Sequence, residues 1–375
     1  MDGLRAIAVL AVLVHHAYGT RLAGWALGNI GVSVFFSISG FLAYYVLRRD
    51  EGRLGHVNYN YFLLRRILRI WPAYFAIIAV AYLTEPSDGH SAANMAQFFT
   101  FTLNWDMAFF LPWTNLPHLW SIAVEEQFYV LAPFMYWALH SKYRISFCIV
   151  VLLLCNVARV SYIFFENHPT GNGGLYYMTY TYADLFLVGA MVARQYTDGW
   201  EPRLATQVAC FWVSIIAFPA ITKLWAPAIF APYPWFAALA YALPATVCIP
   251  LLICILPNRQ TVWSRLLSLP LMQYIGRLSY SLYLVHLYVL YSLLPPNGFP
   301  ADRDSLRFVV IYISVCCALA QISYHGVELW FLRLKDEKIR MKLIRYPWPA
   351  VLICTLLFIG FTRLLFFALH VSALP

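Results

Sequence analysis

Long apolar runs constrain the fold of this chain more than any other feature of its sequence. A helix that crosses a bilayer needs about 20 mostly apolar residues. About eleven such segments fit within the 375 residues, and 62% of all residues are hydrophobic while only 11% are charged, which is far from the balance of soluble proteins. We therefore predict an all-α polytopic membrane protein embedded in a lipid bilayer. The predicted spans cover roughly 4–22, 30–47, 70–84, 119–139, 145–165, 178–194, 205–224, 235–256, 272–294, 306–330 and 348–370.

The basic residues indicate how these spans are oriented. Most of the 26 Lys and Arg residues fall on alternate connections, in stretches such as RRDEGR, HSKYR and LRLKDEKIRMKLIR, whereas TEPSDGHSAAN and ENHPTGNGG are poor in them. Cytoplasmic loops of membrane proteins carry such an excess of positive charge. We expect the N-terminus in the cytoplasm and, after an odd number of spans, the C-terminus outside. The net charge of +9 is then a topology signal and gives no reason to expect a nucleic-acid partner.

The first predicted span carries three ionisable side chains that do not suit lipid. In LRAIAVLAVLVHHA, Arg5 and His16 are eleven positions apart, which in a helix is about three full turns and roughly 16 Å along the axis. They share one helix face, whereas His15 points about 100° away. Ionisable groups within a membrane usually line a path or a site, and histidine can accept a proton near neutral pH. The alternative is a packing histidine bonded to a backbone carbonyl.

Small residues mark the second predicted span. The stretch GVSVFFSISGFL places Ser37 and Ser39 between Gly31 and Gly40. Small residues let two helices pack closely, and they would equally leave room for a narrow substrate or acyl tunnel. Both interpretations stay open from the sequence.

Three arginines lie about one turn apart at the expected cytoplasmic boundary of the third span. In LLRRILRIWPAYF they are Arg65, Arg66 and Arg69. Arginines at this depth can anchor the helix among lipid headgroups. They can also bind an anionic, phosphorylated ligand, because the guanidinium fork matches phosphate geometry.

Two adjacent carboxylates fall inside the apolar stretch WSIAVEEQFYVLAPF. Glu125 and Tyr129 are four positions apart and share a helix face, while Glu126 is turned about 100° away. A buried carboxylate needs a partner or a proton. Glu125 could be tied to an arginine of a neighbouring helix, or it could orient His16 or a hydroxyl substrate.

Other polar residues within apolar runs are more often buried ties than catalysts. Arg159 and Arg363 each need a partner that the sequence does not identify. The aromatic segment at about 95–113 is expected to lie at the membrane interface or to re-enter the membrane, and it could receive a sugar. The remaining polar residues of this kind are Asp184, Arg277, Tyr280, Tyr283, His286, His325 and Glu328.

Several blocks of the sequence together resemble the membrane-bound acyltransferase-3 family. After Arg5 and His16 they are, in order, GVSVFFSISGFL, RRILRIWPAYF, WSIAVEEQFY, YADLFLVGA and GRLSYSLYLVHL, and the resemblance extends from residue 2 to about 334. It implies transfer of an acyl group, usually acetyl from acetyl-CoA, to a hydroxyl of a surface glycan or a glycosylated small molecule. It also implies a multi-pass protein of the bacterial cytoplasmic (inner) membrane. The family's membrane domain would occupy 1–334, and 335–375 would form a cytoplasmic basic loop and an additional transmembrane helix.

The resemblance also implies roles for individual residues. His16 matches the family's proposed catalytic histidine, Arg5 its paired arginine, and Glu125 the more constant carboxylate of its block. One departure is Trp330, which stands where the family commonly has proline and weakens the match of the last family span. The arginines expected near the donor are Arg65, Arg66 and Arg69, and the expected supporting residues are His15, Ser37, Ser39, Tyr74, Glu126 and Tyr129.

Two classes of function remain to be weighed. In the enzyme hypothesis, acyl-CoA docks from the cytoplasm, His16 acts as general base on a sugar hydroxyl, and Glu125 orients His16; a covalent acyl-histidine route stays open. The competing class is a proton-coupled transporter, or an acyl-group translocator without transferase chemistry, because buried His, Glu and Arg also suit proton coupling. No metal is expected, since none of the 8 cysteines has zinc-ligand spacing. The acceptor and the oligomeric state do not follow from the sequence.

Overall fold

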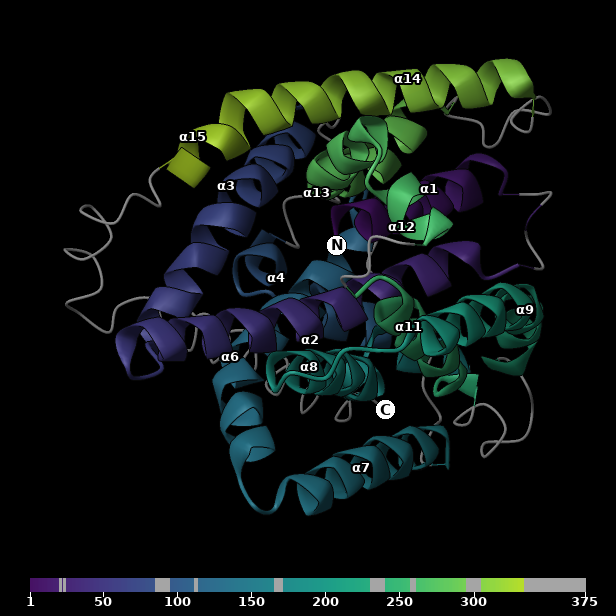
Figure 1. Ribbon diagram of the computed structural model, residues 1–375. Coiled ribbons are helices and arrows are strands. Elements are labelled where there is room, and N and C mark those ends of the chain that lie inside the picture. Colours follow the sequence, from purple (N-terminus) through teal and green to yellow (C-terminus); the bar gives the residue numbers. More distant parts are fainter. Residues whose placement is uncertain are drawn as a thin grey trace, which may run out of the picture.

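The regular structure of this protein is helical throughout the residues that the computed structural model describes (Figure 1). Those residues are 1–19, 22, 25–84, 95–110, 114–164, 171–229, 240–256, 261–294 and 305–333. The longer helices are α1 (Asp2–Ala17), α2 (Leu27–Leu54), α3 (Tyr59–Thr84), α6 (Trp120–His140), α7 (Arg144–Phe164), α8 (Ala183–Thr197), α9 (Leu204–Ile229), α11 (Leu243–Cys254), α13 (Pro270–Leu293) and α14 (Leu306–Ser323). The short ones are α4 (Met95–Phe99), α5 (Leu103–Phe109), η2 (Pro117–Leu119), η3 (Gly171–Tyr177), η4 (Thr179–Tyr182), α12 (Val262–Leu267), η5 (Tyr324–Glu328) and α15 (Leu329–Arg333).

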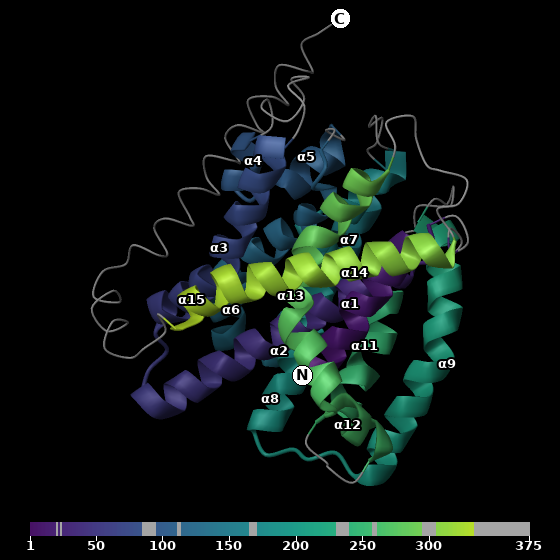
Figure 2. The same ribbon diagram turned by 90° about the horizontal axis from the view of Figure 1, so that it is seen from above.

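The central helices stack in layers around α1. Helix α1 packs between α2 and α13, α2 packs in turn on α8, and α13 packs on α14 (Figure 1). The helices α14 and α15, joined by the π-helical turn η5, run as one long rod along one edge of this stack (Figures 1 and 2). Because α1 has protein on two sides, its ionisable side chains do not have to face lipid.

The helical architecture and its apolar outer faces confirm an all-α membrane protein. Within the described residues, 5 helices are long and apolar enough to cross a membrane: Leu27–Leu54, Tyr59–Thr84, Arg144–Tyr162, Leu204–Leu224 and Leu306–Arg333. Helices also occupy the other predicted spans up to residue 330. The eleven-span count and the orientation of the termini stay predictions, and the segment 348–370 with Arg363 lies outside the described residues.

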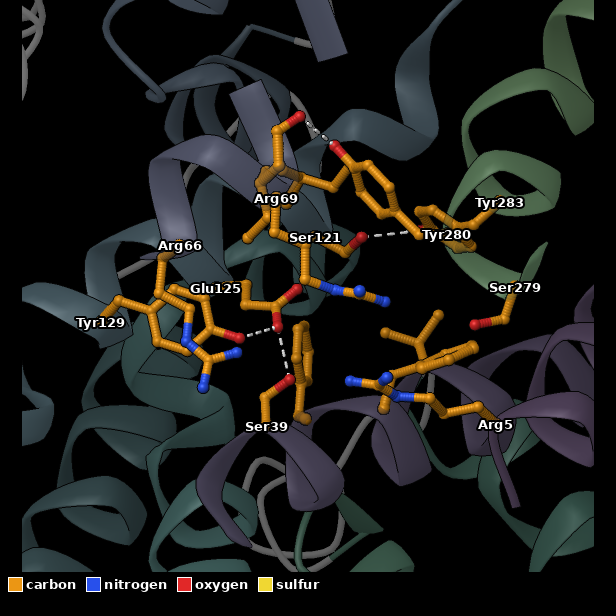
Figure 3. Close-up of a pocket in the computed structure, with 15 residues that line it drawn as sticks. Arg5, Ser39, Arg66, Arg69, Ser121, Glu125, Tyr129, Ser279, Tyr280 and Tyr283 are labelled. Carbon is orange, nitrogen blue, oxygen red and sulfur yellow. Dashed lines mark hydrogen bonds between the residues drawn. The ribbon is translucent and has the colours of Figure 1, made fainter. Parts of the chain in front are cut away.

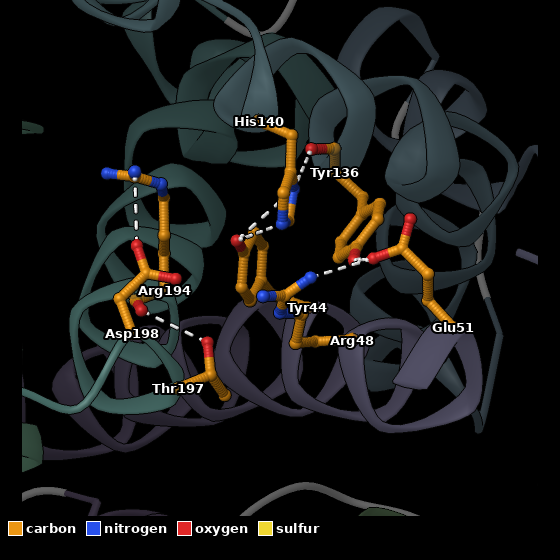
Figure 4. Close-up of polar contacts among 8 residues, drawn as sticks. All are labelled: Tyr44, Arg48, Glu51, Tyr136, His140, Arg194, Thr197 and Asp198. Atoms are coloured by element: carbon orange, nitrogen blue, oxygen red, sulfur yellow. Dashed lines mark hydrogen bonds and ion pairs between the residues drawn. The ribbon is translucent and has the colours of Figure 1, made fainter. Parts of the chain in front are cut away.

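Two predicted boundaries are wrong, because the helices continue beyond the apolar runs. Helix α3 begins at Tyr59 rather than near residue 70, and α2 continues to Leu54, where Gly55 ends it with a positive φ of 76°. Three charged residues in the added part of α2, Arg48, Asp50 and Glu51, have charged partners. Arg48 pairs with Glu51 at 2.9 Å, and the hydroxyl of Tyr136 donates to the same carboxylate at 2.6 Å (Figure 4). Because such pairs neutralise the charged side chains, a helix can continue beyond its apolar segment.

The small residues of α2 serve close helix packing at the contact with α8. A Cβ added at Gly40 would lie 2.0 Å from the carbonyl oxygen of Phe186, and one added at Gly189 of α8 would lie 1.9 Å from that of Ser37. The hydroxyl of Ser37 donates back to the carbonyl of Ser33 at 3.1 Å. The packing interpretation therefore holds for this part of α2.

Candidate active site

Two cavities share part of their walls near the centre of the helix stack. Val32 of α2 and Tyr283 of α13 line both of them. We call the first the arginine cavity; its empty volume is about 650 Å³, and its lining includes Arg5, Ser39, Arg66, Arg69, Ser121, Glu125, Tyr129, Ser279 and Tyr280. We call the second the histidine cavity; its empty volume is about 670 Å³, and its lining includes Val12, His16, Asn29, His118, Trp120, Tyr176 and Tyr177.

The arginine cavity collects positive charge from two helices that are distant in the sequence. Arg5 comes from α1, while Arg66 and Arg69 come from α3 (Figure 3). The guanidinium carbon of Arg66 lies 4.8 Å from the ring centroid of Tyr129, so a cation–π contact helps to hold this side chain. Among the described residues of the lining, Glu125 is the one carboxylate, so the cavity suits an anionic ligand.

Glu125 is held from two sides within this cavity. The hydroxyls of Ser39 on α2 and of Tyr129, one turn further along α6, both donate to its carboxylate (Figure 3). The predicted spacing of Glu125 and Tyr129 on one helix face is thereby confirmed. Glu125 therefore lines the arginine cavity, whereas His16 lines the other one.

Hydrogen bonds fix the ring of Tyr283 in the wall between the cavities. Its hydroxyl lies 2.6 Å from Oγ of Ser121 (Figure 3). The same hydroxyl donates to the carbonyl oxygen of His118 at 3.0 Å. On the same helix, one turn back, the hydroxyl of Tyr280 donates to the carbonyl oxygen of Ile70 at 2.7 Å, which ties α13 to α3. The wall is thus part of a bonded network rather than a loosely packed ring.

The orientation of His16 follows from its bond to its own helix. Its Nδ1 lies 2.9 Å from the carbonyl oxygen of Val12. A carbonyl can only accept, so Nδ1 carries the hydrogen, and Nε2 is the nitrogen that can accept a proton. The packing alternative is thus observed for Nδ1, while the same ring also lines a cavity.

His15 has a different environment from its neighbour. A Cβ added at Gly28 of α2 would lie 2.8 Å from Cδ2 of His15, so this ring fills the space that the glycine leaves. It meets the ring of His16 edge to face, with centroids 5.2 Å apart. Its observed place is that of a packing residue beside His16.

Arg65 lies apart from the arginine cavity. It forms an ion pair with Asp50 of α2, and its guanidinium carbon lies 3.9 Å from the ring centroid of Tyr61. The prediction grouped it with Arg66 and Arg69, but the helical turn directs it to another neighbour.

Two further predicted residues support the site from a distance. The hydroxyl of Tyr74 donates to the carbonyl oxygen of Phe98 at 3.0 Å, and the buried carboxylate of Glu126 accepts from Nε1 of Trp71 at 3.2 Å. Tyr74 thereby ties α3 to α4, and Trp71 ties α3 to α6 through Glu126. Neither side chain is part of the lining of the two cavities.

The aromatic surface near His16 comes from an unexpected part of the chain. The expectation was the segment 95–113, of which the described part forms α4 and α5 and packs into the core through Phe101 and Asn104, which accept from Nε2 of Gln127 at 2.8 and 2.9 Å. The rings that line the histidine cavity belong instead to Trp120, Tyr176 and Tyr177.

Sequence reasoning missed His118 and treated Tyr283 and His286 as buried ties. A signal was present, because His118, Ser121 and Glu125 follow each other at spacings of three and four, which places them along one helix face. No spacing signal in the sequence links α6 to α13, since the two helices are far apart in the chain. Among the described residues, no group of three or more His, Cys, Asp or Glu is arranged to hold a metal ion.

Comparison with known proteins agrees with this arrangement of the chain. The family Acyl_transf_3, described as an acyltransferase domain, matches residues 1–325. "Putative peptidoglycan O-acetyltransferase YrhL" of Bacillus subtilis (strain 168) is 28% identical over 359 residues, which cover 88% of this chain and 54% of that protein. "O-acetyltransferase OatA" of Staphylococcus aureus (strain NCTC 8325 / PS 47) is 25% identical over 349 residues, with 88% of this chain and 56% of that protein covered.

The chain spans about half the length of these relatives. No solved structure matches it. Since the family match takes in most of the chain, including Arg5, His16, the α3 arginines and Glu125, the chain belongs to the acyltransferase-3 family.

Proposed function

We propose that this protein is an integral-membrane O-acyltransferase that moves an acyl group, in the simplest case acetyl, from acyl-CoA to a hydroxyl of a surface glycan. The observation that carries the proposal is the pair of cavities that share Val32 and Tyr283, one lined by arginines and the other by His16. The names of the relatives, O-acetyltransferases with peptidoglycan in one case, support both the acetyl group and the glycan.

The arginine cavity is the proposed donor site. Coenzyme A carries several phosphates, and Arg5, Arg66 and Arg69 present three guanidinium groups to one carboxylate. The excess of positive charge would hold the phosphates near the helix ends. The thioester would then extend inward to the wall at Tyr283.

The histidine cavity is the proposed acceptor site. The rings of Trp120, Tyr176 and Tyr177 offer broad apolar faces with polar edges, which suit the faces and hydroxyls of a sugar. Asn29 adds an amide that can donate to and accept from a hydroxyl. A sugar placed here would bring a hydroxyl to Nε2 of His16.

In the proposed reaction, His16 acts as general base. Its Nε2 removes the proton of the acceptor hydroxyl while the oxygen attacks the thioester carbonyl carbon. The new oxygen–carbon bond forms, the carbon–sulfur bond breaks, and the leaving thiolate takes the proton to become the thiol of coenzyme A. The carbonyl of Val12 orients the ring, so the orienting role expected for Glu125 passes to the backbone, and Glu125 serves the donor cavity.

The proposed orientation places the donor in the cytoplasm. Arg5 near the start of α1 and the arginines near the start of α3 lie at the end of the stack that the positive-inside rule assigns to the cytoplasm. The acceptor cavity, one helix length further along α1, then faces the other side. In a bacterium this membrane would be the cytoplasmic (inner) membrane.

The test uses the full chain in lipid nanodiscs with radiolabelled acetyl-CoA and soluble peptidoglycan fragments. We expect labelled ester in the fragments with the wild type and a loss of at least a hundredfold with His16→Ala. His15→Gln, which changes the neighbouring ring outside both cavities, should lose far less. Equal labelling by wild type and His16→Ala would refute the general-base role.

A second arm distinguishes the competing class of function. In sealed proteoliposomes, an acyl-group translocator would deliver label across the membrane without forming an ester on the glycan. A proton-coupled transporter would move protons without any use of acetyl-CoA. The transferase proposal requires ester formation together with release of free coenzyme A.

A further inference from the structure

Three imidazole rings from three separate elements meet at the histidine cavity. The ring of His286 on α13 lies between the other two, with its centroid 4.9 Å from that of His16 on α1 and 4.6 Å from that of His118 on η2. His118 is 4% exposed and His286 is fully buried. His286 therefore packs against the proposed base, and His118 packs against His286, both away from solvent.

The hydrogen positions on these two rings follow from their backbone bonds. Nε2 of His118 lies 2.9 Å from the carbonyl oxygen of Leu284, and Nδ1 of His286 lies 2.6 Å from that of Tyr283. Because carbonyls only accept, these two nitrogens carry the hydrogens of the neutral rings. The other nitrogen of each ring carries a lone pair and can accept a hydrogen bond. Those nitrogens, Nδ1 of His118 and Nε2 of His286, are buried without a hydrogen-bond partner in the described part of the chain.

Unpaired buried acceptors are rare in folded proteins, and each requires a physical reason. A positive charge on the neighbouring ring would supply one here. When His16 takes a proton, its ring becomes a cation beside the ring of His286, and the ring of His118 lies on the other side of His286. Among the described residues, the lining of the histidine cavity contains no carboxylate.

We propose that His286 and His118 are positioning residues whose lone pairs stabilise the proton that His16 holds during acyl transfer. The proton comes from the acceptor hydroxyl, resides on Nε2 of His16, and returns to the thiolate when the carbon–sulfur bond breaks. Neither positioning ring forms a bond to carbon. The inference rests on the proposed function, and it gives these two neutral rings the charge-compensating role that a carboxylate has in a Ser-His-Asp triad.

Several other titratable groups face the cluster and belong to the same electrostatic environment. His15 lies beside His16 on α1, and the ring centroid of Tyr283 is 5.2 Å from that of His286 and 5.5 Å from that of His118. The tyrosines of η3, Tyr176 and Tyr177, line the cavity, and Glu125 of α6 faces Tyr283 from the arginine cavity. The test leaves all of these groups unchanged.

The two rings are anchored through different nitrogens, and this difference allows a reciprocal test. In His286→Asn the amide nitrogen can keep the bond made by Nδ1, but no atom replaces the lone pair of Nε2. In His118→Gln the amide nitrogen can keep the bond made by Nε2, but no atom replaces the lone pair of Nδ1. His286→Gln and His118→Asn can instead place an amide oxygen at the lone pair and lose the anchor. One pair of variants therefore removes the lone pair, and the other removes only the backbone bond.

The direct measurement is the pH dependence of His16 modification by diethylpyrocarbonate, followed by mass spectrometry on the full chain in nanodiscs. This reagent modifies the unprotonated ring and needs no acceptor glycan. We expect His286→Asn and His118→Gln to move the midpoint at His16 to lower pH by about one unit, a size typical of a lost charge-stabilising neighbour. His286→Gln and His118→Asn should keep the wild-type midpoint. An unchanged midpoint in the first pair, or the same shift in all four variants, overturns the proposal.

A second measurement follows the acetylation of peptidoglycan fragments. The acid limb of the pH–rate profile should move to lower pH in the first pair of variants only, with kcat lowered tenfold or more and KM for acetyl-CoA unchanged. If the wild type acetylates nothing, the proposed function fails, and the midpoint at His16 still decides this inference. Since either ring alone provides a lone-pair variant and an anchor variant, one misfolded protein leaves the other ring to decide the result.

Discussion

At the scale of single residues, two consecutive arginines of α3 have different surroundings. Arg66 lines the arginine cavity, while its neighbour Arg65 is paired with Asp50. Both were equivalent in the sequence, since either could bind phosphate or anchor the helix. The different partners make the two arginines a matched pair for mutation.

We expect Arg66→Ala to raise KM for acetyl-CoA roughly tenfold, because a charge-assisted bond to phosphate is lost. The effect should shrink as salt is added, since salt screens the remaining attraction. Arg65→Ala should leave KM and its salt dependence close to those of the wild type. Initial rates of coenzyme A release at several salt concentrations measure KM and its salt dependence. Equal effects of the two variants would indicate that these arginines only anchor the helix in the membrane.

Tyr283 is the residue that separates the two proposed substrates. Tyr283→Phe removes the bonds to Ser121 and to the carbonyl of His118, so the ring should turn more freely and admit water to the thioester. We expect several molecules of coenzyme A to be released for each ester formed, against about one in the wild type. Tyr280→Phe, which loses only the bond to Ile70, is the control and should keep the wild-type ratio. A ratio near one in both variants would contradict a separating role for the wall.

At the scale of elements, the contact between α2 and α8 depends on the absence of a side chain. A Cβ at Gly189 would meet the backbone of α2 at 1.9 Å, whereas a Cβ at Gly52 near the end of α2 would meet nothing within 4 Å. Gly189→Ala should therefore destabilise the protein by about 1–3 kcal/mol through overpacking. Gly52→Ala should be neutral or stabilise it by up to about 1 kcal/mol. Thermal unfolding of both variants in detergent compares them, and equal melting temperatures would show that the two helices can move apart without cost.

Helices α7 and α8 are joined by a buried ion pair. Arg159, which is 0% exposed, donates to Asp184 at 2.7 Å and also to the carbonyl oxygen of Thr181. Arg159→Met leaves the carboxylate buried without its counter-ion, and we expect a loss of about 3–5 kcal/mol. Arg159→Met combined with Asp184→Asn should recover a good part of that loss. Thermal unfolding would reveal no recovery in the double variant if the two residues act independently.

At the scale of the whole molecule, the sequence predicted the helical class of the fold, while the site residues stay predictions. Regular spacing within one helix was sufficient for Arg5 with His16 and for Glu125 with Tyr129. It could not predict that His286 packs against His16 or that Asp184 pairs with Arg159, because helix spacing says nothing about which helices become neighbours. For the same reason it could not predict that Glu125 lines the arginine cavity while His16 lines the other one.

The orientation of the whole molecule can be measured directly. In a cysteine-free background, His56→Cys between α2 and α3 should react with a membrane-impermeant maleimide only from the cytoplasmic side. Ser305→Cys at the start of α14 should react only from the opposite side, because the loop before it belongs to the set poor in basic residues. Labelling of intact cells and of inverted vesicles compares the two faces, and the reverse pattern would overturn the proposed direction of transfer.

The wall formed by Val32 and Tyr283 also bears on the energetics of the cell. Two aqueous cavities entered from opposite faces would, if they joined, form a continuous water path through which protons could run down their gradient. In the proposed arrangement, the bonded ring of Tyr283 would interrupt that path, so that acyl transfer would not dissipate the proton-motive force. We therefore expect selection at this wall to act on the membrane's electrical insulation as much as on catalysis, and a leaky variant to slow growth even where its product is not needed.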